Sequence, residues 1–408
     1  MLAFLKSGSS TSKSTTVTPQ LNTLVYYAAA QVPSALWQSI IPTQQWYMQL
    51  PYLLAQEQVL PSHIQSVYAI HTMHNVVVAA YYAQLITLNA AQLQALRHTT
   101  ANQIILKTAL TLLPIIHKLI PCAQCKILVI GNSIVTQDYM MRNNSTYSNM
   151  ACIHNLITHV KKKHPIEATI IKDAPFSLEQ EIKKLSKPYQ VLPLLPTMQL
   201  PIAAHWHTMH DYTQQLLAKY RTVYHSCNKK LAPIRIQQLS NADVDLHQDQ
   251  LYTLLLQVIN RNHNTYNTVA PNYFSVMKHT FPHQFYVLGY FLHNELIGFA
   301  SYFATTSVLE AAYVGLNYDY NTTHKLYQNM LYQYVQSTIE HKCTMLNLSR
   351  TATEIKSVLG AVPTYYNCYI TIENKLVKKI VTPIIQNLKS DAYTIRSPFK
   401  KTASTYPN

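Results

Sequence analysis

Glycine is the residue that this chain most clearly lacks. Only 6 of its 408 residues are glycine, whereas the usual share of ~7% would give roughly thirty. Phosphate-binding loops of the G-x-G-x-x-G and G-x-x-x-x-G-K-S/T types need closely spaced glycines, and the chain contains neither. A G-x-S-x-G nucleophile elbow is also absent. The missing glycine loops exclude Rossmann-type dinucleotide enzymes and kinases. The missing elbow argues against an α/β-hydrolase, although residue spacing alone leaves a Ser-His-Asp triad open.

Charged residues are scarce as well, at 12% of the chain against a usual share of about 25%. The polar surface must therefore come largely from uncharged side chains, including 19 histidines and 30 tyrosines. The 17 acidic residues face 32 basic ones, which gives a formal net charge of +15. Such a charge attracts nucleic acid, anionic lipid or phosphorylated ligands. A role in solubility alone is an equally simple interpretation.

No long apolar run reaches the ~20 residues that a membrane-spanning helix needs. The most apolar stretch, residues 104–122, is interrupted by Lys107, Pro114, His117 and Lys118, and we interpret it as a buried or docking helix. The first residues do not read as a signal peptide. We therefore expect a cytoplasmic protein whose six cysteines are reduced.

Metal ligands occur only in scattered groups. The candidates are Cys122 with Cys125, the run His205, His207 and His210, and the pair His71 and His74. The C-x-x-C pair has no second pair and no histidine pair at zinc-finger spacing. Because histidine is abundant throughout the chain, we predict no metal site.

The length predicts two globular units, since chains usually divide beyond ~250–300 residues. Hydrophobic residues form 48% of the sequence, enough for sizeable cores. We predict a flexible leader over residues 1–39, a first domain over 40–210, a second over 211–386 and a loose basic tail over 387–408.

Periodicity in the last third predicts a β-β-β-α-β-α-β order, a mixed α+β unit with one parallel crossover. The predicted strands are residues 285–291, 296–304, 307–316, 343–348 and 365–372, and the first two form a hairpin about His293 and Asn294. A long helix capped by Thr322 and Thr323 should run to about Lys342, and a short one should cover residues 351–359.

The first half is predicted less sharply. The expected helices are residues 46–58, 90–120, 148–163 and 177–186, and the expected strands are 66–71, 76–88, 126–131, 168–172 and 189–195. His74 and Asn75 should form the turn of the first hairpin. Asp211 should cap a helix over 212–228, and a strand over 234–238 and helices over 248–260 and 273–279 should follow.

Three segments carry a resemblance to a known family. They are LGYFLHNELIGFASYF (288–303), YVGLNYDYNTTHKLYQNMLY (313–332) and LSRTATEIKSVLGA (348–361). They resemble the second half of Fem-type, peptidoglycan-bridge-forming transferases. WYMQLPYLLAQEQ (46–58) is similar to the entry of the first half, and residues 196–221 resemble the junction. The resemblance covers about residues 40–385.

The resemblance implies an α+β fold of two tandem GNAT-like (acyl-CoA N-acyltransferase) domains, each a mixed, mostly antiparallel sheet flanked by helices. The first domain would be degenerate, and the second would hold the active site. In such folds the acyl carrier binds where the strand before the long helix separates from its neighbour. The start of that helix faces the pyrophosphate, because unpaired N–H groups there attract an anion.

The resemblance therefore assigns carrier binding to the start of the predicted helix and to the segment after the next strand. The predicted contacts are Thr322, Thr323, His324, Lys325, Arg350 and Lys356. Plain helix capping and surface solvation are the alternative roles. The segment from Leu316 to Leu326 contains no glycine, unlike the usual pyrophosphate loop. This departure weakens ordinary acetyl-CoA binding, but matters less for a Fem-type enzyme, whose donor is aminoacyl-tRNA.

The acceptor amine must lose a proton to react, and a carboxylate near the separated strand is the natural base. Glu310 on the third strand and Asp319 in the loop after it are the candidates. Either could instead be a solvated surface carboxylate. Without a base, positioning and stabilisation of the oxyanion must suffice.

Three functions follow from these features. The first is N-acyl transfer from an acyl-CoA-type carrier to an amine acceptor. The second is Fem-type transfer from aminoacyl-tRNA to a bacterial peptidoglycan precursor, which the net positive charge favours. The third is a catalytically inactive tandem-GNAT binding protein. Basic runs at residues 161–163, 183–187 and 219–230 would suit RNA if they shared one face. An anionic membrane surface is a further candidate partner.

Overall fold

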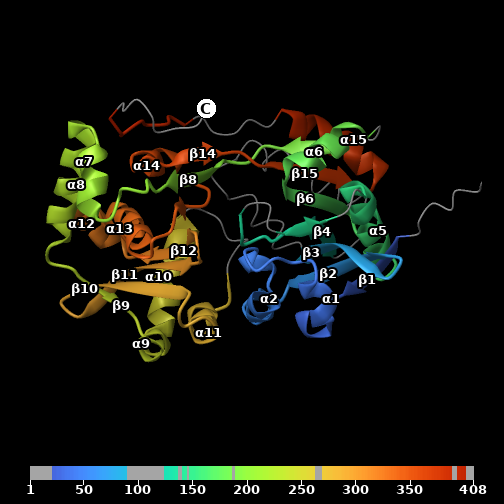
Figure 1. The fold of residues 1–408 in the computed structure, drawn as a ribbon, viewed down its shortest axis with the longest axis horizontal. Coiled ribbons are helices and arrows are strands. Elements are labelled where there is room, and N and C mark those ends of the chain that lie inside the picture. Colours follow the sequence, from blue (N-terminus) through green and yellow to red (C-terminus); the bar gives the residue numbers. More distant parts are fainter. Residues whose placement is uncertain are drawn as a thin grey trace, which may run out of the picture.

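The computed structural model describes residues 21–89, 124–136, 140–144, 147–185, 189–261, 269–387 and 393–400. Two β-sheets lie next to each other, and helices flank each sheet (Figure 1). The predicted helix over residues 90–120 and Cys122 lie outside these residues, whereas Cys125 lies within them.

The first sheet has the order β1-β2-β3-β4-β6-β15-β7, and β5 pairs with β3. Its strands are β1 (Asn22–Tyr26), β2 (Ile64–Met73), β3 (Val76–Asn89), β4 (Gln124–Ile130), β5 (Met141–Asn143), β6 (Ala168–Ala174), β7 (Gln190–Leu192) and β15 (Asn367–Ile372). Only the β4–β6 pair is parallel. The helices of this unit are η1 (Ala29–Gln31), α1 (Ser34–Gln38), η2 (Trp46–Met48), α2 (Leu50–Glu57), α5 (Asn149–Lys161), α6 (Phe176–Lys183) and α15 (Lys375–Gln386).

The second sheet has the order β14-β8-β13-β12-β11-β10-β9. Its strands are β8 (Thr197–Pro201), β9 (Arg235–Gln238), β10 (Phe285–Leu292), β11 (Glu295–Ala304), β12 (Val308–Leu316), β13 (Met345–Asn347) and β14 (Val362–Thr364). Only the β12–β13 pair is parallel. The helices are α7 (Met209–Gln215), α8 (Ala218–Leu231), α9 (Asn241–Leu246), α10 (Gln248–Arg261), α11 (Tyr273–Thr280), α12 (Tyr318–His324), α13 (Leu326–Glu340) and α14 (Thr353–Ser357).

Both predicted hairpins are present, and both turn through a His-Asn pair. His74 and Asn75 have φ of 49° and 63°, and His293 and Asn294 have φ of 48° and 68°. A two-residue hairpin turn needs positive φ at both positions to match the strand twist. Asparagine and histidine tolerate this backbone region better than most residues, so the chain builds its hairpins without glycine.

The predicted flexible leader is wrong over residues 22–39. β1 pairs with β2 from Asn22↔Thr72 to Tyr26↔Tyr68, and the Trp37 indole of α1 is fully buried and donates to Met48 O at 2.7 Å. Apolar residues in this stretch include the unbroken run LVYYAAA at residues 24–30. Such a run shows neither the alternation of a strand nor the spacing of a helix, so periodicity alone did not reveal a strand there.

The predicted domain boundaries differ from the structure because each sheet takes a strand from the other half of the chain. β8 lies in the second sheet although it precedes residue 211. β15 lies in the first sheet, between β6 and β7, although it follows the second unit. Periodicity identifies a strand but not its partner, and both pairings join residues far apart in sequence. The two units are therefore interlinked by strand exchange.

The predicted loose tail is wrong over residues 393–400. Phe399 forms a β-bridge with Leu216, and its ring lies 5.4 Å from that of Trp206 and 6.0 Å from that of Tyr212. The Phe399 ring also covers Gly360, where a Cβ would collide with it. The segment is held against the second unit.

Two helix predictions also need correction. Thr208, and not Asp211, caps α7, while Asp211 closes the capping box as its third residue. The helix then breaks at Leu216, so α8 is separate. Similarly, Thr322 and Thr323 lie inside α12, and Lys325, with φ of 51°, separates α12 from α13.

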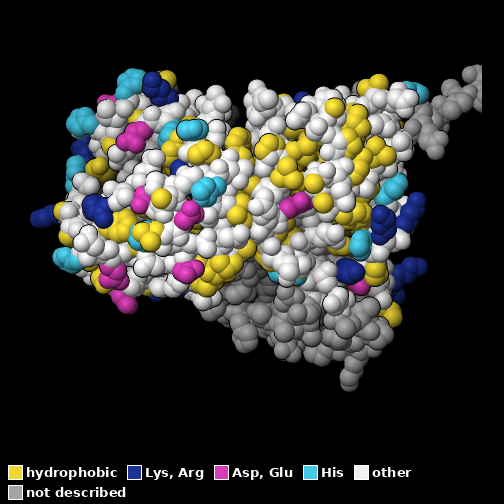
Figure 2. Space-filling model, turned by 90° about the horizontal axis from the view of Figure 1, so that it is seen from below, with side chains coloured by type: hydrophobic (Ala, Val, Ile, Leu, Met, Phe, Trp, Pro, Cys, Tyr) yellow, Lys and Arg dark blue, Asp and Glu magenta, His cyan; other side chains and the backbone are white. Residues whose placement is uncertain are grey.

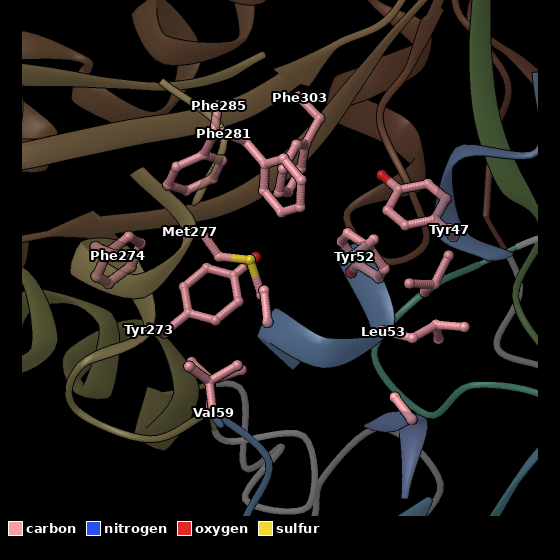
Figure 3. Close-up of a cluster of buried hydrophobic side chains, with 14 of the residues drawn as sticks. Tyr47, Tyr52, Leu53, Val59, Tyr273, Phe274, Met277, Phe281, Phe285 and Phe303 are labelled. Carbon is pink, nitrogen blue, oxygen red and sulfur yellow. The ribbon is translucent and has the colours of Figure 1, made fainter. Parts of the chain in front are cut away.

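Aromatic residues of both units share one core (Figure 3). Tyr52 of α2 lies 5.9 Å from the ring of Phe303 and 6.3 Å from that of Phe281. Tyr47 lies 6.2 Å from Phe303. Buried aromatic pairs of this kind add stability beyond their buried area. The shared core fixes the first unit against the second at the place where the site lies.

Candidate active site

Strand β12 separates from β13 in the second unit. The two strands pair from Val308↔Met345 to Glu310↔Asn347, but β12 continues to Leu316. Among the described residues, no strand pairs with residues 311–316 on the β13 side. The backbone groups on that side of the strand can therefore bind a ligand as a further strand would.

A β-bulge accompanies this separation. Ser301 of β11 faces two residues of β12, since Ala300 pairs with Val314 and Tyr302 pairs with Ala311. The Ser301 hydroxyl donates to Tyr313 O at 2.9 Å and accepts from Tyr313 N at 3.1 Å. A bulge bends its strand and increases the local twist. It therefore helps to explain why β12 leaves β13 just after Glu310.

The separated strands open into a cavity of about 720 Å³ between the two units. The first unit contributes Tyr47, Tyr52, residues 133–136, Lys172 and Leu194 to its wall. The second contributes residues 310–314 of β12, residues 348–352 after β13, Lys356, and apolar side chains of α10 and α13. The volume is in the range of sites for drug-sized ligands.

Glu310 lies where the strands separate and is only 6% exposed. Asn347, its register partner on β13, donates a side-chain hydrogen bond to its carboxylate. Burial raises the pKa of Tyr52 well above its usual value, and the negative charge of Glu310 adds to this shift. The sequence-predicted base thus lies in the cavity wall, near a tyrosine of the first unit.

Lys356 is the second predicted residue in the wall. It is 4% exposed, and its Nζ donates to Arg350 O at 2.6 Å. Burial lowers the pKa of Lys356 to about 7, because a charged amine is poorly solvated there. None of the ion pairs among the described residues includes this amine. Lys356 can therefore hold or release a proton near neutral pH.

Arg350 joins the two units. Its guanidinium pairs with the Asp173 carboxylate at the end of β6, and its Nε donates to Leu195 O at 2.9 Å. Lys172 Nζ lies 2.6 Å from the other Asp173 oxygen and donates to Val135 O at 2.6 Å. Burial alone would raise the pKa of Asp173, but Lys172 and Arg350 hold it below its usual value.

The remaining predicted residues lie away from the cavity. Asp319 is exposed, and its backbone N–H donates to Asn317 Oδ1 at 3.0 Å. Thr322, Thr323 and Lys325 are exposed as well. His324 Nδ1 lies 3.0 Å from Lys230 O. None of these residues lines the cavity.

Helix α12 occupies the position where the resemblance led us to look for a pyrophosphate loop. At the start of α13, Asn321 Oδ1 accepts from Tyr327 N at 3.0 Å. An N–H group that an anion would use is therefore already bonded to a side chain. The predicted Thr322–Lys325 contacts thus have no geometric support as a phosphate site.

Sequence reasoning missed the first-unit side of the cavity, above all Ser133 and Lys172, and the buried Asp173 that pairs with Lys172. The available signal was a charged pair, Lys172 and Asp173, at the carboxyl end of the otherwise apolar strand that pairs with β4. Residues at the carboxyl ends of parallel strands often meet ligands. Without the strand pairing, this pair could not be placed opposite Glu310.

The basic runs do not share one face. Residues 161–163 and 183–184 belong to the α5–α6 end of the molecule, and residues 219–230 belong to α8 at the opposite end (Figure 1). On the face drawn in Figure 2, lysine and arginine side chains likewise lie mostly toward its two ends. Lys187 lies outside the described residues. The condition set for recognition of RNA by one basic face is therefore not met.

The described residues also offer little for a membrane or a metal ion to use. No helix there is long and apolar enough to cross a bilayer. No group of three or more histidine, cysteine or acidic residues there is arranged to hold a metal ion.

No family model and no curated protein matches the chain. Solved structures do match. A tandem GNAT protein from the clavulanic acid biosynthesis pathway aligns with a TM-score of 0.51 and 9% identity, over 86% of this chain and 98% of that one. FemX aligns with a TM-score of 0.49 and 10% identity, over 88% and 100%. A GCN5-related N-acetyltransferase from Kribbella flavida aligns with a TM-score of 0.40 and 8% identity, over 87% of this chain and 72% of that one.

The match to the tandem GNAT protein, together with the two sheets, confirms the predicted fold. The chain has an α+β architecture of two tandem GNAT-like domains, each with a mostly antiparallel sheet flanked by helices. At 9% identity the match concerns the fold alone.

Proposed function

We propose that the chain is an acyltransferase that moves an acyl group from a carrier to an amine. The separation of β12 from β13 at Glu310 carries this proposal, because it opens a lined cavity beside unpaired strand backbone. An extended carrier arm can pair with residues 311–314 as an added strand. Its acyl carbonyl then lies near Glu310, with the first unit forming the opposite wall.

The reaction needs few groups. The neutral amine of the acceptor attacks the acyl carbon, a C–N bond forms, and the bond from that carbon to the carrier breaks. Glu310 accepts the proton that the amine loses, directly or through a water, and the leaving group takes up a proton. Lys356 and Arg350 lie on the β13 side of the opening, where we assign them contacts to the carrier or the acceptor.

An acyl-CoA is the first candidate carrier, since a tandem GNAT fold with a separated strand pair suits a thioester arm. Helix α12 and the Asn321 cap favour a second candidate, because they occupy the place of a diphosphate loop. That candidate is aminoacyl transfer from charged tRNA to a cell-wall precursor. The basic runs lie at opposite ends of the molecule and form no continuous surface for tRNA, so we rank charged tRNA as the second candidate carrier.

A ligand-stability screen tests the proposal. Acetyl-CoA, a medium-chain and a long-chain acyl-CoA, free CoA and a charged-tRNA mixture would each be added to the purified chain. Ligand at 100 times its dissociation constant adds about 2.7 kcal/mol to stability, which moves the melting point by a few degrees. A shift graded by acyl length supports acyl-CoA, and a salt-sensitive shift with charged tRNA alone supports the second candidate. No shift with any of them overturns both in favour of an inactive binding protein.

A further inference from the structure

One corner of the cavity carries charge to which the proposed reaction assigns no step in bond making or proton transfer. Both cations line the cavity: Lys172 belongs to the first unit, and Arg350 belongs to the second. Their side chains are only 15% and 13% exposed. The corner therefore brings two largely buried cations to the junction of the two units.

These two cations share a single carboxylate. Asp173, whose side chain is 1% exposed, pairs with Lys172 through Oδ2, while Arg350 donates to Oδ1 and, at 3.4 Å, to Oδ2 as well. The further hydrogen bonds of the two cations go to neutral backbone carbonyls, Val135 O and Leu195 O. The corner thus holds one more positive than negative charge. Burial of a charge is costly unless an opposite charge neutralises it.

Glu310, a carboxylate that does line the cavity, has other neighbours. Asn347 donates to it, and its charge contributes to the raised pKa of Tyr52. Burial lowers the pKa of Lys172, the Asp173 carboxylate raises it and the Arg350 guanidinium lowers it. The positive surplus is therefore local to the unit junction.

A polar group without a partner lies on the same wall. The Ser133 hydroxyl is buried and has no hydrogen-bond partner among the described residues, although Ser133 lines the cavity. Its loop is held in place, since Ser133 N donates to Gln84 Oε1 at 2.7 Å. Val135, two residues on, accepts from Lys172. A buried hydroxyl without a partner costs free energy that a ligand can recover.

We propose that this corner is a subsite for an anionic oxyacid group, a carboxylate or a phosphate, on one of the substrates. Lys172 and Arg350 contact its oxygens, and the Ser133 hydroxyl donates to it. The identification of the ligand as a substrate rests on the proposed function. Anion binding at the corner is a property of the folded chain and is measurable without turnover.

Calorimetric titration of inorganic phosphate and of acetate into the full chain at low salt tests the subsite. The wild type should bind an anion, and Lys172→Met should weaken binding roughly tenfold or more, as expected for loss of a charged hydrogen bond. Lys172→Arg should retain most of the affinity. Lys183→Met removes an exposed lysine of α6 and is the matched control. Asp173→Asn should strengthen binding, since it removes the competing carboxylate.

Melting curves establish that each variant is folded. Equal affinity in the wild type and Lys172→Met, or no saturable binding of either anion to the wild type, would overturn the subsite. If Asp173→Asn does not fold, the comparison of Lys172→Met and Lys172→Arg with the wild type still decides the question.

Competition decides which substrate carries the anion. If it belongs to the carrier, coenzyme A should displace phosphate from the wild type. If it belongs to the acceptor, O-phosphoethanolamine should displace it better than ethanolamine, and β-alanine better than propylamine. Phosphate binding through Lys172 without acyl transfer to any amine would keep the subsite and remove the proposed function, so the two failures are distinguishable.

Discussion

The two units use the same strand order around their parallel pair, but only one of them opens. In the first unit, β4 pairs with β6 up to its own last residue, Ile130↔Ile171, and the chain turns away at Gly131. In the second unit, β12 pairs with β13 only as far as Glu310 and continues without this partner over residues 311–316. A site therefore depends less on the fold than on where one strand stops pairing.

The first unit contributes to the cavity in another way. Instead of an opening, it supplies the loop after β4 and the charged end of β6 as a wall. Its buried amides fix this loop, since Asn132 donates to Gln56 Oε1 at 2.6 Å and Ile134 N donates to Asn132 Oδ1 at 3.1 Å. The unit whose parallel strands stay paired therefore forms a fixed wall of the cavity that the separated strands of the other unit open.

Removal of β15 should have the largest effect, because β15 is the strand that joins β6 to β7 in the first sheet. A chain that ends at residue 364 lacks the strand between β6 and β7 and leaves the edge of β6 unpaired. We expect loss of cooperative folding, measured by circular dichroism on heating. A truncation after residue 387 keeps β15 and is the control. Cooperative melting of the first unit in the shorter chain would contradict the exchange.

The next effect concerns the opening itself. Glu310→Gln should lower turnover by roughly 10²-fold or more if the carboxylate is the base, while the melting point changes little. Asp319→Asn, on an exposed carboxylate outside the cavity, should leave turnover unchanged. Steady-state rates with the donor found in the screen provide the measurement. Equal losses in both variants would remove the special role of Glu310.

A smaller loss of stability should follow Gly315→Ala in β12. A Cβ there would collide with the Phe299 ring and lie 2.8 Å from the backbone of Leu254 and Leu255 in α10. Overpacking of this kind costs about 1–3 kcal/mol, which denaturant titration measures. A variant as stable as the wild type would show that α10 can move away from the opened strand.

The effect of Lys356 on stability is gradual, because it is spread over a range of pH. Its pKa is lowered to about 7 in the folded chain, whereas an unfolded lysine has a pKa near about 10.4. Between these values the unfolded chain binds more protons, so stability should rise with pH by up to about 1.4 kcal/mol per unit. Below pH ~7 both states are protonated, and this contribution levels off.

Lys356→Met should remove this rise of stability with pH. Denaturant titrations at several pH values between about 7 and about 10 measure it. Lys183→Met, on an exposed amine, should retain it. An unchanged slope in Lys356→Met would mean that water reaches the amine.

The sequence predicted the local features well and the distant ones poorly. The His-Asn turns and the strand that carries Glu310 follow from turn chemistry and alternation, which act over a few residues. The opening beside Glu310 was expected from the family resemblance alone. The partners of β8 and β15 depend on contacts across most of the chain, which periodicity does not encode. Thr322 and Thr323 resembled a cap, but Lys325 adopts the left-handed conformation that divides the helix. The role of Lys172 appears only once β6 is placed beside β4.

The strand exchange also sets an order for synthesis. The second sheet lacks β14 until Thr364 has been made, and the first lacks β15 until Ile372 has been made. A ribosome-bound chain therefore carries two unfinished sheets for most of its translation, with the edge of β6 exposed to unsuitable partners. Both sheets then become complete within a few residues of each other. Late closure of distant pairings folds slowly, so a growing chain of this kind should depend on chaperones until its last segment emerges.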